Sequence, residues 1–189
     1  MALDQTTQTS DDALLVLYAN GDPGAALELT GRIAPRLLSF CTRMLRDVAE
    51  AEDVVQEAML RLWKIAPKWQ PGAAKPSTWA FRVASNLCTD RLRKGRGVGL
   101  DQIAEPVDDA PSVEAQLMQE ERLRALDAAL GVLPERQRQA VVLRHIEGLS
   151  NPEIGEILEI SVEAVESLTA RGKRALAAEL AGKKEELGL

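Results

Sequence analysis

Apolar residues recur with helical spacing through residues 50–66, and this periodicity constrains the fold more than any other feature of the sequence. Side chains at i, i+3, i+4 and i+7 lie on one buried stripe of an α-helix. The stripe consists of Ala51, Val54, Val55, Ala58, Leu62 and Ile65. Aromatic residues make up 3% of the chain, and runs of β-branched residues are scarce. The sequence therefore predicts an all-α protein with small aliphatic cores.

The same helix carries a second face that the core does not need, formed by Asp53, Gln56, Glu57 and Leu60. We call these four residues the acidic face. Carboxylates in the first turn of a helix also interact favourably with its dipole, by roughly 0.3–1 kcal/mol each. Two interpretations follow, namely that the acidic residues stabilise the helix or that they bind a partner.

Length and rare residues limit the remaining possibilities. A chain of 189 residues suits one domain or two small ones. The sequence has no apolar run near 18 residues and no secretory signal, so we expect a cytoplasmic protein without membrane insertion. Cys41 and Cys88 lie in apolar helical patterns, which predicts buried reduced thiols. Because His145 is the only histidine, we expect no metal site and no cofactor.

Charge is distributed unevenly, although the net charge is -6. Residues 61–96 hold nine Lys and Arg and one Asp, whereas residues 97–121 hold seven acidic residues and no basic one. The distribution predicts a surface that binds phosphates beside a segment that DNA repels. An acidic protein gains little from counterion release, so we expect weak DNA binding without a positioning partner.

Turn residues divide the first half of the chain into helices. The predicted elements are a tail at 1–10, a helix to 19, a turn at 20–24, a helix to 47, the helix at 50–66, a loop at 69–76 and a helix at 77–94. We expect Asp11 or Asp12 to cap the first helix and Ser77 to cap the last. Pro35 should kink or split the second helix.

Polar residues recur at helical spacing along the helix at 77–94, on the side away from its apolar face. They are Arg82, Ser85, Asn86, Thr89 and Arg93, and we call them the polar stripe. Arginine suits phosphates, and Asn, Ser and Thr suit base edges, so the stripe suits a nucleic-acid strand. Trp79 and Phe81 could stack on bases, although aromatic residues on a helix more often belong to a core.

A helix-turn-helix motif follows in the second half. Helices are predicted at 112–130 and 133–148, then a short helix capped by Ser150, a turn at Ile160 and Ser161, and a last helix at 162–180. Glycine, proline and acidic residues before them predict a flexible acidic linker. The domains are thus a tail at 1–10, a helical domain at 11–96, the linker at 97–114, a helix-turn-helix domain at 115–182 and a tail at 183–189.

These motifs together resemble a bacterial RNA polymerase sigma factor of the extracytoplasmic-function type. The resemblance covers residues 12–180 and rests on DVVQE at 53–57, on the helix at 77–94 and on LPERQRQAVVLRHIEGLSNPEIGEILEISVEAVESL at 133–168. It implies a promoter-specificity subunit with core RNA polymerase and promoter DNA as partners, and an anti-sigma factor that no residue identifies. It also implies that the linker passes through the polymerase, whereas composition alone fits a passive tether equally well.

The resemblance assigns residues to three interfaces. The acidic face (Asp53, Gln56, Glu57 and Leu60) would bind core polymerase. Contacts to the -10 strand would come from Lys75, Arg82, Asn86, Arg91, Arg93 and Lys94. Contacts to the -35 element would come from Ser161, Glu163, Ala164, Glu166, Ser167, Arg171, Lys173 and Arg174. Glu159, Glu166, Leu168 and Thr169 depart from the family pattern, which predicts an unusual -35 sequence.

Two other classes of protein compete with a sigma factor. A free-standing helix-turn-helix regulator, whose first domain senses a ligand or dimerises, should bind duplex DNA alone as a dimer. An α-helical enzyme would need a nucleophile and a base, and His145 has no evident partner pattern. The sequence therefore predicts a protein that is not an enzyme.

Overall fold

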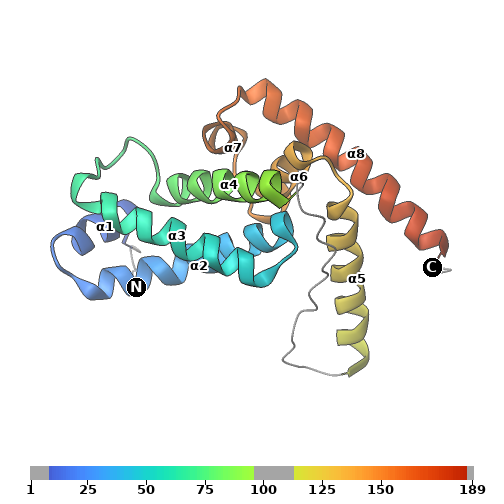
Figure 1. Ribbon diagram of the computed structural model, residues 1–189, viewed down its shortest axis with the longest axis horizontal. Helices are drawn as coiled ribbons and strands as arrows, with labels where there is room; N and C mark the ends of the chain where they lie inside the picture. The colour runs from blue at the N-terminus through green and yellow to red at the C-terminus, as the bar shows by residue number, and fades with distance from the viewer. Residues whose placement is uncertain (1–8, 96–112, 187–189) are drawn as a thin grey trace, which may run out of the picture.

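The computed structural model describes residues 9–95 and 113–186, and every regular element in these ranges is helical (Figure 1). The first domain contains α1 (Asp11–Ala19), α2 (Pro23–Leu45), α3 (Val48–Ile65), a 3₁₀ turn η1 (Ala66–Lys68) and α4 (Pro76–Gly95). The second contains α5 (Val113–Gly131), α6 (Glu135–Val141), a π-helical turn η2 (Val142–Ile146), α7 (Asn151–Leu158) and α8 (Val162–Glu186). The all-α prediction is confirmed. The predicted linker lies outside the described residues except where it overlaps the start of α5, and residues 1–8 and 187–189 of the two predicted tails lie outside them too. Residues 183–186, which were predicted to belong to the second tail, instead continue α8.

The predicted apolar stripe of α3 forms the centre of the first domain. Of its six residues only Ile65 is not fully buried, and the stripe packs on α2 and α4. The Phe40 and Phe81 rings meet edge to face behind it, with centroids 5.8 Å apart. Because α3 uses this side for packing, its acidic face turns outward.

The predicted cap of the first helix was wrong, and the second helix is not split at its proline. The cap of α1 is Ser10, whose hydroxyl accepts from the Ala13 amide at 3.2 Å, and not Asp11 or Asp12. Helix α2 runs unbroken through Pro35. Proline removes one helical hydrogen bond, but burial of Ile33 and Leu37 on either side holds the helix in one piece.

Each cysteine is buried in the first domain, and neither forms a disulfide. A hydrogen bond with Cys41, together with burial, raises the pKa of the Cys88 thiol. Both thiols are buried and behave as small apolar side chains, as the sequence predicts.

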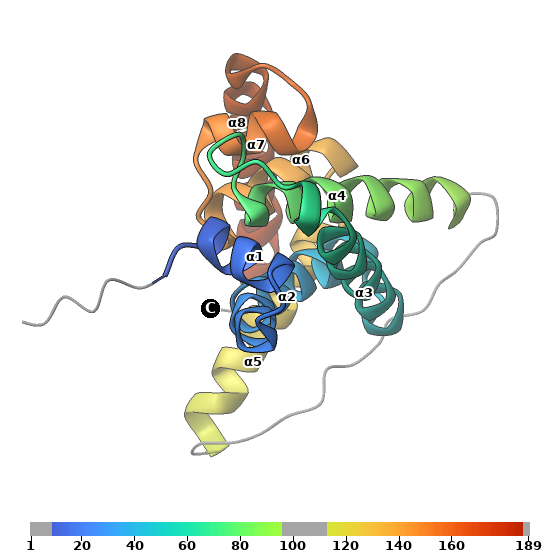
Figure 2. The same cartoon turned by 90° about the vertical axis from the view of Figure 1, so that its left-hand side faces the viewer.

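The second domain packs against the first. Helices α6 and α7 lie beside α4 in two perpendicular views (Figures 1 and 2), and α5 reaches α2. Buried apolar residues of both domains form one continuous cluster. Within the second domain α8 crosses α6 closely at Gly172, where an added Cβ would lie 2.6 Å from Val141 Cγ2. No helix of the described residues is long and apolar enough to cross a membrane.

Candidate polymerase and nucleic-acid interfaces

The acidic face is a continuous exposed surface on α3. Asp53 and Gln56 are exposed, and Leu60 is an exposed large apolar residue at 48%. Glu57 is half-buried and accepts a hydrogen bond from Arg61 Nε at 2.8 Å. The structure therefore brings the four predicted residues together, with two polar groups and one leucine free of the core.

The basic residues at the end of α4 differ in their surroundings. Arg91 binds the carboxylate of Glu50 and donates to its backbone oxygen at 3.1 Å, which ties α4 to the start of α3. Arg93 is exposed and pairs with Asp90 at 2.8 Å, and Lys94 is exposed. Arg91 is thus half-buried and held against α3, whereas Arg93 and Lys94 are exposed and accessible to a phosphate.

The polar stripe is only partly accessible. Asn86 is exposed and Arg82 is half-buried, but Ser85 is 2% exposed. Ser85 and Thr89 accept hydrogen bonds from Gln139 of α6, and Lys75 pairs with Glu153 of α7. The second domain therefore contacts two residues of the polar stripe, Ser85 and Thr89, and also Lys75 in the loop before α4.

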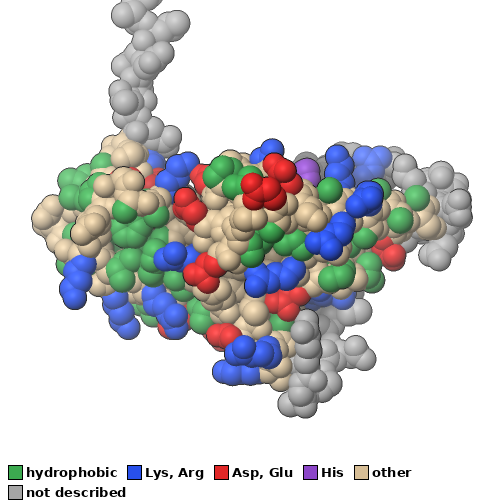
Figure 3. Space-filling view, turned by 90° about the horizontal axis from the view of Figure 1, so that it is seen from above, with side chains coloured by type: hydrophobic (Ala, Val, Ile, Leu, Met, Phe, Trp, Pro, Cys, Tyr) green, Lys and Arg blue, Asp and Glu red, His purple; other side chains and the backbone are tan. Residues whose placement is uncertain are grey.

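A cavity of about 430 Å³ lies between the end of α3, η1 and the loop at 69–75. It is lined by Lys64, Ile65, Lys68, Trp69, Gln70, Ala73, Ala74 and Trp79. Trp69 Nε1 donates to Asp12 Oδ1 at 2.7 Å, which fixes one wall. Apolar side chains gather at this end of the molecule in the space-filling view (Figure 3). Aromatic faces beside lysines suit an unstacked base and its phosphate.

The residues that the resemblance assigns to the -10 strand include none that line this cavity, although the sequence offers Trp79 as one side chain that could stack on a base. Trp79 packs against the core, as predicted, but it also lines the cavity. Lys64 and Lys68 were noticed only as part of a basic block. The signal that could have found the site is the pair Trp69 and Trp79 at the two ends of a loop rich in proline and glycine.

The helix-turn-helix motif forms as the sequence predicts. A capping box begins α7, because the Glu153 amide donates to Ser150 Oγ and the Ser150 amide donates to Glu153 Oε2. The hydrogen bond from Lys75 and, next, those from Ser150 lower the pKa of Glu153 to about 2. The turn after α7 approaches Gly155 closely, since an added Cβ there would lie 2.9 Å from the backbone oxygen of Ile160.

Helix α8 presents its predicted DNA-facing residues to solvent. Glu163, Glu166, Ser167, Arg171 and Arg174 are exposed at helical spacing, Lys173 and Ser161 are also exposed, and Ala164 is half-buried. Ser161 Oγ accepts from the Ala164 amide at 3.2 Å and so caps the helix. The first turns of the exposed stripe are therefore acidic, and the later turns are basic.

Glu159, one of the departures from the family pattern, has a strained backbone. Its φ of 55° is left-handed, a conformation that costs a residue with a side chain about 1–2 kcal/mol. We expect Glu159→Gly to raise the free energy of unfolding by about 0.5–1 kcal/mol, measured by urea denaturation followed by circular dichroism. As a control, Glu156→Gly inside α7 should lower it by about 1 kcal/mol. A loss of stability in Glu159→Gly would show that its side chain contributes more than the strain costs.

Comparison with known proteins agrees with this architecture. The Sigma-70 region 2 family matches residues 29–97, and the Sigma-70 region 4 family matches residues 123–176. The ECF RNA polymerase sigma factor SigW of Bacillus subtilis is 33% identical in an alignment of 171 positions that covers 85% of this chain and 91% of SigW. The two matched regions define a sigma-70 type transcription factor. More narrowly, the chain belongs to the extracytoplasmic-function (ECF) sigma factors.

Two solved structures have a similar fold. CnrH in complex with the cytosolic domain of CnrY has a TM-score of 0.70 at 25% identity, covering 92% of this chain and 99% of CnrH. The sigma factor RpoE of Bartonella quintana, in complex with the anti-sigma factor NepR, has a TM-score of 0.68 at 22% identity. The match covers 82% of this chain and 95% of RpoE. Sigma factors are promoter-specificity subunits of RNA polymerase, and this chain is one of them. The free-standing regulator is accordingly not favoured.

Proposed function

We propose that this sigma factor binds core RNA polymerase through the acidic face of α3. The support is that Asp53, Gln56 and Leu60 are exposed although the opposite side of the same helix is fully used in the core. A leucine between exposed polar groups is typical of the centre of a protein interface, where an apolar anchor is surrounded by hydrogen-bonding groups.

The melted -10 strand binds, in this proposal, along α4 and into the cavity beside it. Asn86 and Arg82 supply polar contacts on the helix, and Trp69 and Trp79 supply aromatic walls for one extruded base. Lys64 and Lys68 at the cavity suit the neighbouring phosphates. Arg93 and Lys94 extend the basic surface, whereas Arg91 serves mainly to hold α4 on α3.

The exposed stripe of α8 docks in the major groove of the -35 element. Arg171 and Arg174 suit phosphates or guanine edges, and Glu166 suits cytosine. With a net charge of -6 the chain should bind promoter DNA weakly until the polymerase positions it. It acts in the cytoplasm and catalyses no reaction of its own.

An anti-sigma factor is the proposed regulatory partner. The support is the similarity in fold to CnrH and RpoE, each of which is bound to another protein in its structure, an anti-sigma factor in the case of RpoE.

The decisive experiment is transcription from a cognate promoter by purified core enzyme with and without the chain. Promoter-specific transcripts should appear only when the chain is present. A chain that instead binds duplex DNA by itself as a dimer, and leaves core enzyme inactive, would be a free-standing regulator. The match to both sigma regions, with the acidic face exposed, is the observation that carries the proposal.

Strand capture by α4 has a test of its own. We expect Asn86→Ala and Arg82→Ala each to reduce open-complex formation about threefold to tenfold, the effect of losing one hydrogen bond in the captured state. Permanganate reactivity of the -10 thymines measures the open complex. Footprinting of the -35 element in the same samples is the control and should stay unchanged. Parental reactivity in both variants would make the polar stripe an ordinary solvated surface.

A further inference from the structure

A cluster of basic side chains lies where η2 meets α8 in the second domain. Helix α8 crosses α6 at Gly172, where an added Cβ would lie 2.6 Å from Val141 Cγ2. Lys173 follows Gly172 directly, and His145 lies about one helical turn after Val141. Both residues are exposed, and so is Arg144, which precedes His145. We call Arg144, His145 and Lys173 the basic cluster.

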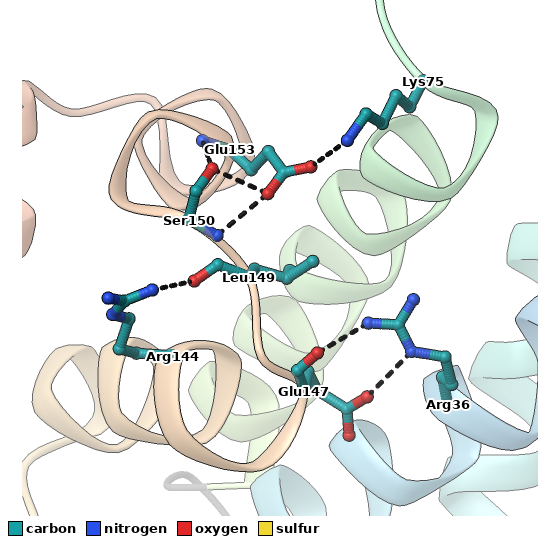
Figure 4. A network of polar contacts seen from close by, with 7 residues as sticks. All are labelled: Arg36, Lys75, Arg144, Glu147, Leu149, Ser150 and Glu153. Atoms are coloured by element: carbon teal, nitrogen blue, oxygen red, sulfur yellow. Dashed lines mark hydrogen bonds and ion pairs between the residues drawn. The ribbon is translucent and has the colours of Figure 1, made fainter.

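The basic cluster borders the proposed DNA-binding surface of α8. Lys173 follows Glu166 by about two helical turns, so the two residues lie on one side of α8. Asn151 Nδ2 lies 3.5 Å from Glu166 Oε1, so this side faces the first turn of α7. Arg144 Nη1 donates to the backbone oxygen of Leu149, just before α7, at 2.9 Å (Figure 4). The cluster therefore extends from α8 towards the start of α7.

This position suits contact with the DNA backbone. When the second helix of a helix-turn-helix motif lies in the major groove, the first helix crosses the backbone. The edge shared by α7 and α8 therefore runs along phosphates in the proposed complex. Basic side chains supply many of the phosphate contacts in protein–DNA complexes. An exposed group of three such residues suits this role.

The basic cluster has no acidic partner that would neutralise it. Neither His145 nor Lys173 forms an ion pair within the part of the chain that the structure describes. Charged residues of α2, α6 and α7, the helices that contact η2, have other partners. Arg36 pairs with Glu147, Glu153 pairs with Lys75, Glu135 accepts from Thr89, and Arg136 and Arg138 donate to backbone oxygens. The cluster therefore keeps its charge for an external anion.

The charge of the cluster depends on pH through His145, which is the only histidine in the chain. Desolvation of the ring and, next, the charges of Lys173 and Arg144 lower the pKa of His145 from its ordinary value. At neutral pH the imidazole of the free chain is therefore mostly uncharged. A phosphate beside the ring would favour the charged form, because opposite charges attract. Protonation and DNA binding would thus promote each other.

We propose that the basic cluster binds a DNA phosphate beside the -35 element, and that protonation of His145 adds one contact to the DNA backbone. The inference rests on the proposed docking of α8 in the major groove. Lys173 and Arg144 supply charge that is present throughout the physiological pH range, whereas the imidazole supplies charge only on acidification. Promoter binding therefore gains strength as the pH falls from about 8 to about 5.

The protonation of His145 can be followed directly in the full-length chain. A single histidine gives one imidazole Hε1 signal in proton NMR, and its chemical shift against pH reports the pKa. Adding a duplex that carries the cognate -35 element should raise the pKa of His145. A pKa that stays constant or falls in the complex would overturn the inference. In the free chain Lys173→Gln should also raise this pKa, because it removes a charge that opposes protonation, and an unchanged value would mean that no cluster exists.

Binding measurements test whether the proton forms a phosphate contact. Holoenzyme with the parental chain should gain about threefold to fivefold in affinity over holoenzyme with His145→Gln between about pH 8 and about pH 5, as expected for one exposed ion pair. The slope of log affinity against log salt should steepen by about 0.9 on acidification in the parent alone. Every other titratable group, Glu166 included, is the same in both chains, so the difference isolates the imidazole. His145→Lys should keep its advantage over His145→Gln at both pH values.

A control variant separates a local contact from general charge. At about pH 8, Glu121→Gln on α5 changes the net charge by as much as His145→Lys does, at an exposed position outside the cluster, and it should bind like the parent. If the parent and His145→Gln share one pH dependence and one salt slope, the inference alone fails. If Arg174→Ala also binds the promoter like the parent, α8 does not dock on the -35 element, and the proposed function fails as well.

Discussion

Replacing Asp53 and Gln56 together with alanine should weaken binding to core RNA polymerase by roughly thirtyfold, or about 2 kcal/mol, as expected for residues at the centre of an interface. Both side chains are exposed on α3, opposite a stripe that is buried throughout its first five residues. The substitutions remove partner contacts without creating a cavity. Affinity is measured by titrating labelled chain with core enzyme, and promoter-specific transcription should fall with it.

A control variant distinguishes the contribution of the acidic face to binding from that of the total charge of α3. Glu52→Ala removes one exposed carboxylate a turn before Gln56, at the edge of the acidic face, and it should weaken binding to core enzyme much less than the double variant does. Unchanged affinity in the double variant would assign Asp53 and Gln56 to helix stabilisation through the dipole. Loss of helical circular dichroism in that variant would point to a structural role instead.

Glu166→Lys should strengthen binding to many -35 sequences and abolish discrimination at one base pair, an effect of about 1–3 kcal/mol. Phosphates repel a carboxylate almost everywhere on duplex DNA, and the amino group of cytosine is its one favourable partner in the major groove. Glu166 is exposed on the stripe that also holds Arg171 and Arg174. The group within reach is Asn151 Nδ2, at 3.5 Å, a long contact that leaves the carboxylate available to DNA.

Selection of -35 sequences by parental and variant holoenzyme measures this effect. The parental sequence preference should show cytosine at one position, and the variant should show no preference there. Glu121→Lys, which makes the same change in charge far from α8 in sequence, should leave the preference intact. Identical preferences for parent and Glu166→Lys would mean that the carboxylate does not contact DNA.

Local patterns predicted most of the helices because a helix depends on near neighbours in the sequence. The apolar stripe of α3 and the capping box of α7 follow from spacings of three and four residues, and both are present in the structure. Helix caps were predicted less well where a distant residue binds the side chain that was expected to cap the helix. Asp11 pairs with Arg32 and Asp12 accepts from Trp69, so neither caps α1.

The candidate sites were likewise predicted where they depend on helical spacing and missed where they depend on contacts between distant residues. Helical spacing places Asn86 and Ser85 next to each other on α4, but only the folded chain shows that Gln139, which is 54 residues away from Ser85, buries Ser85. The cavity beside α4 likewise needs η1 and the loop at 69–75 to fold back on the end of α3. No periodicity in the sequence encodes such contacts, because they depend on how complete helices pack.

The aromatic residues give the two domains different optical signatures. All three tryptophans, the tyrosine and both phenylalanines precede residue 82, and Trp69 and Trp79 line the cavity. Intrinsic fluorescence of the intact chain therefore comes entirely from the first domain, and a base stacked in the cavity would quench it without any attached dye. Unfolding followed by tryptophan emission tracks that domain alone, whereas helical circular dichroism tracks both. Where the two curves coincide, the domains unfold as one cooperative unit, and where they separate, each domain is stable by itself.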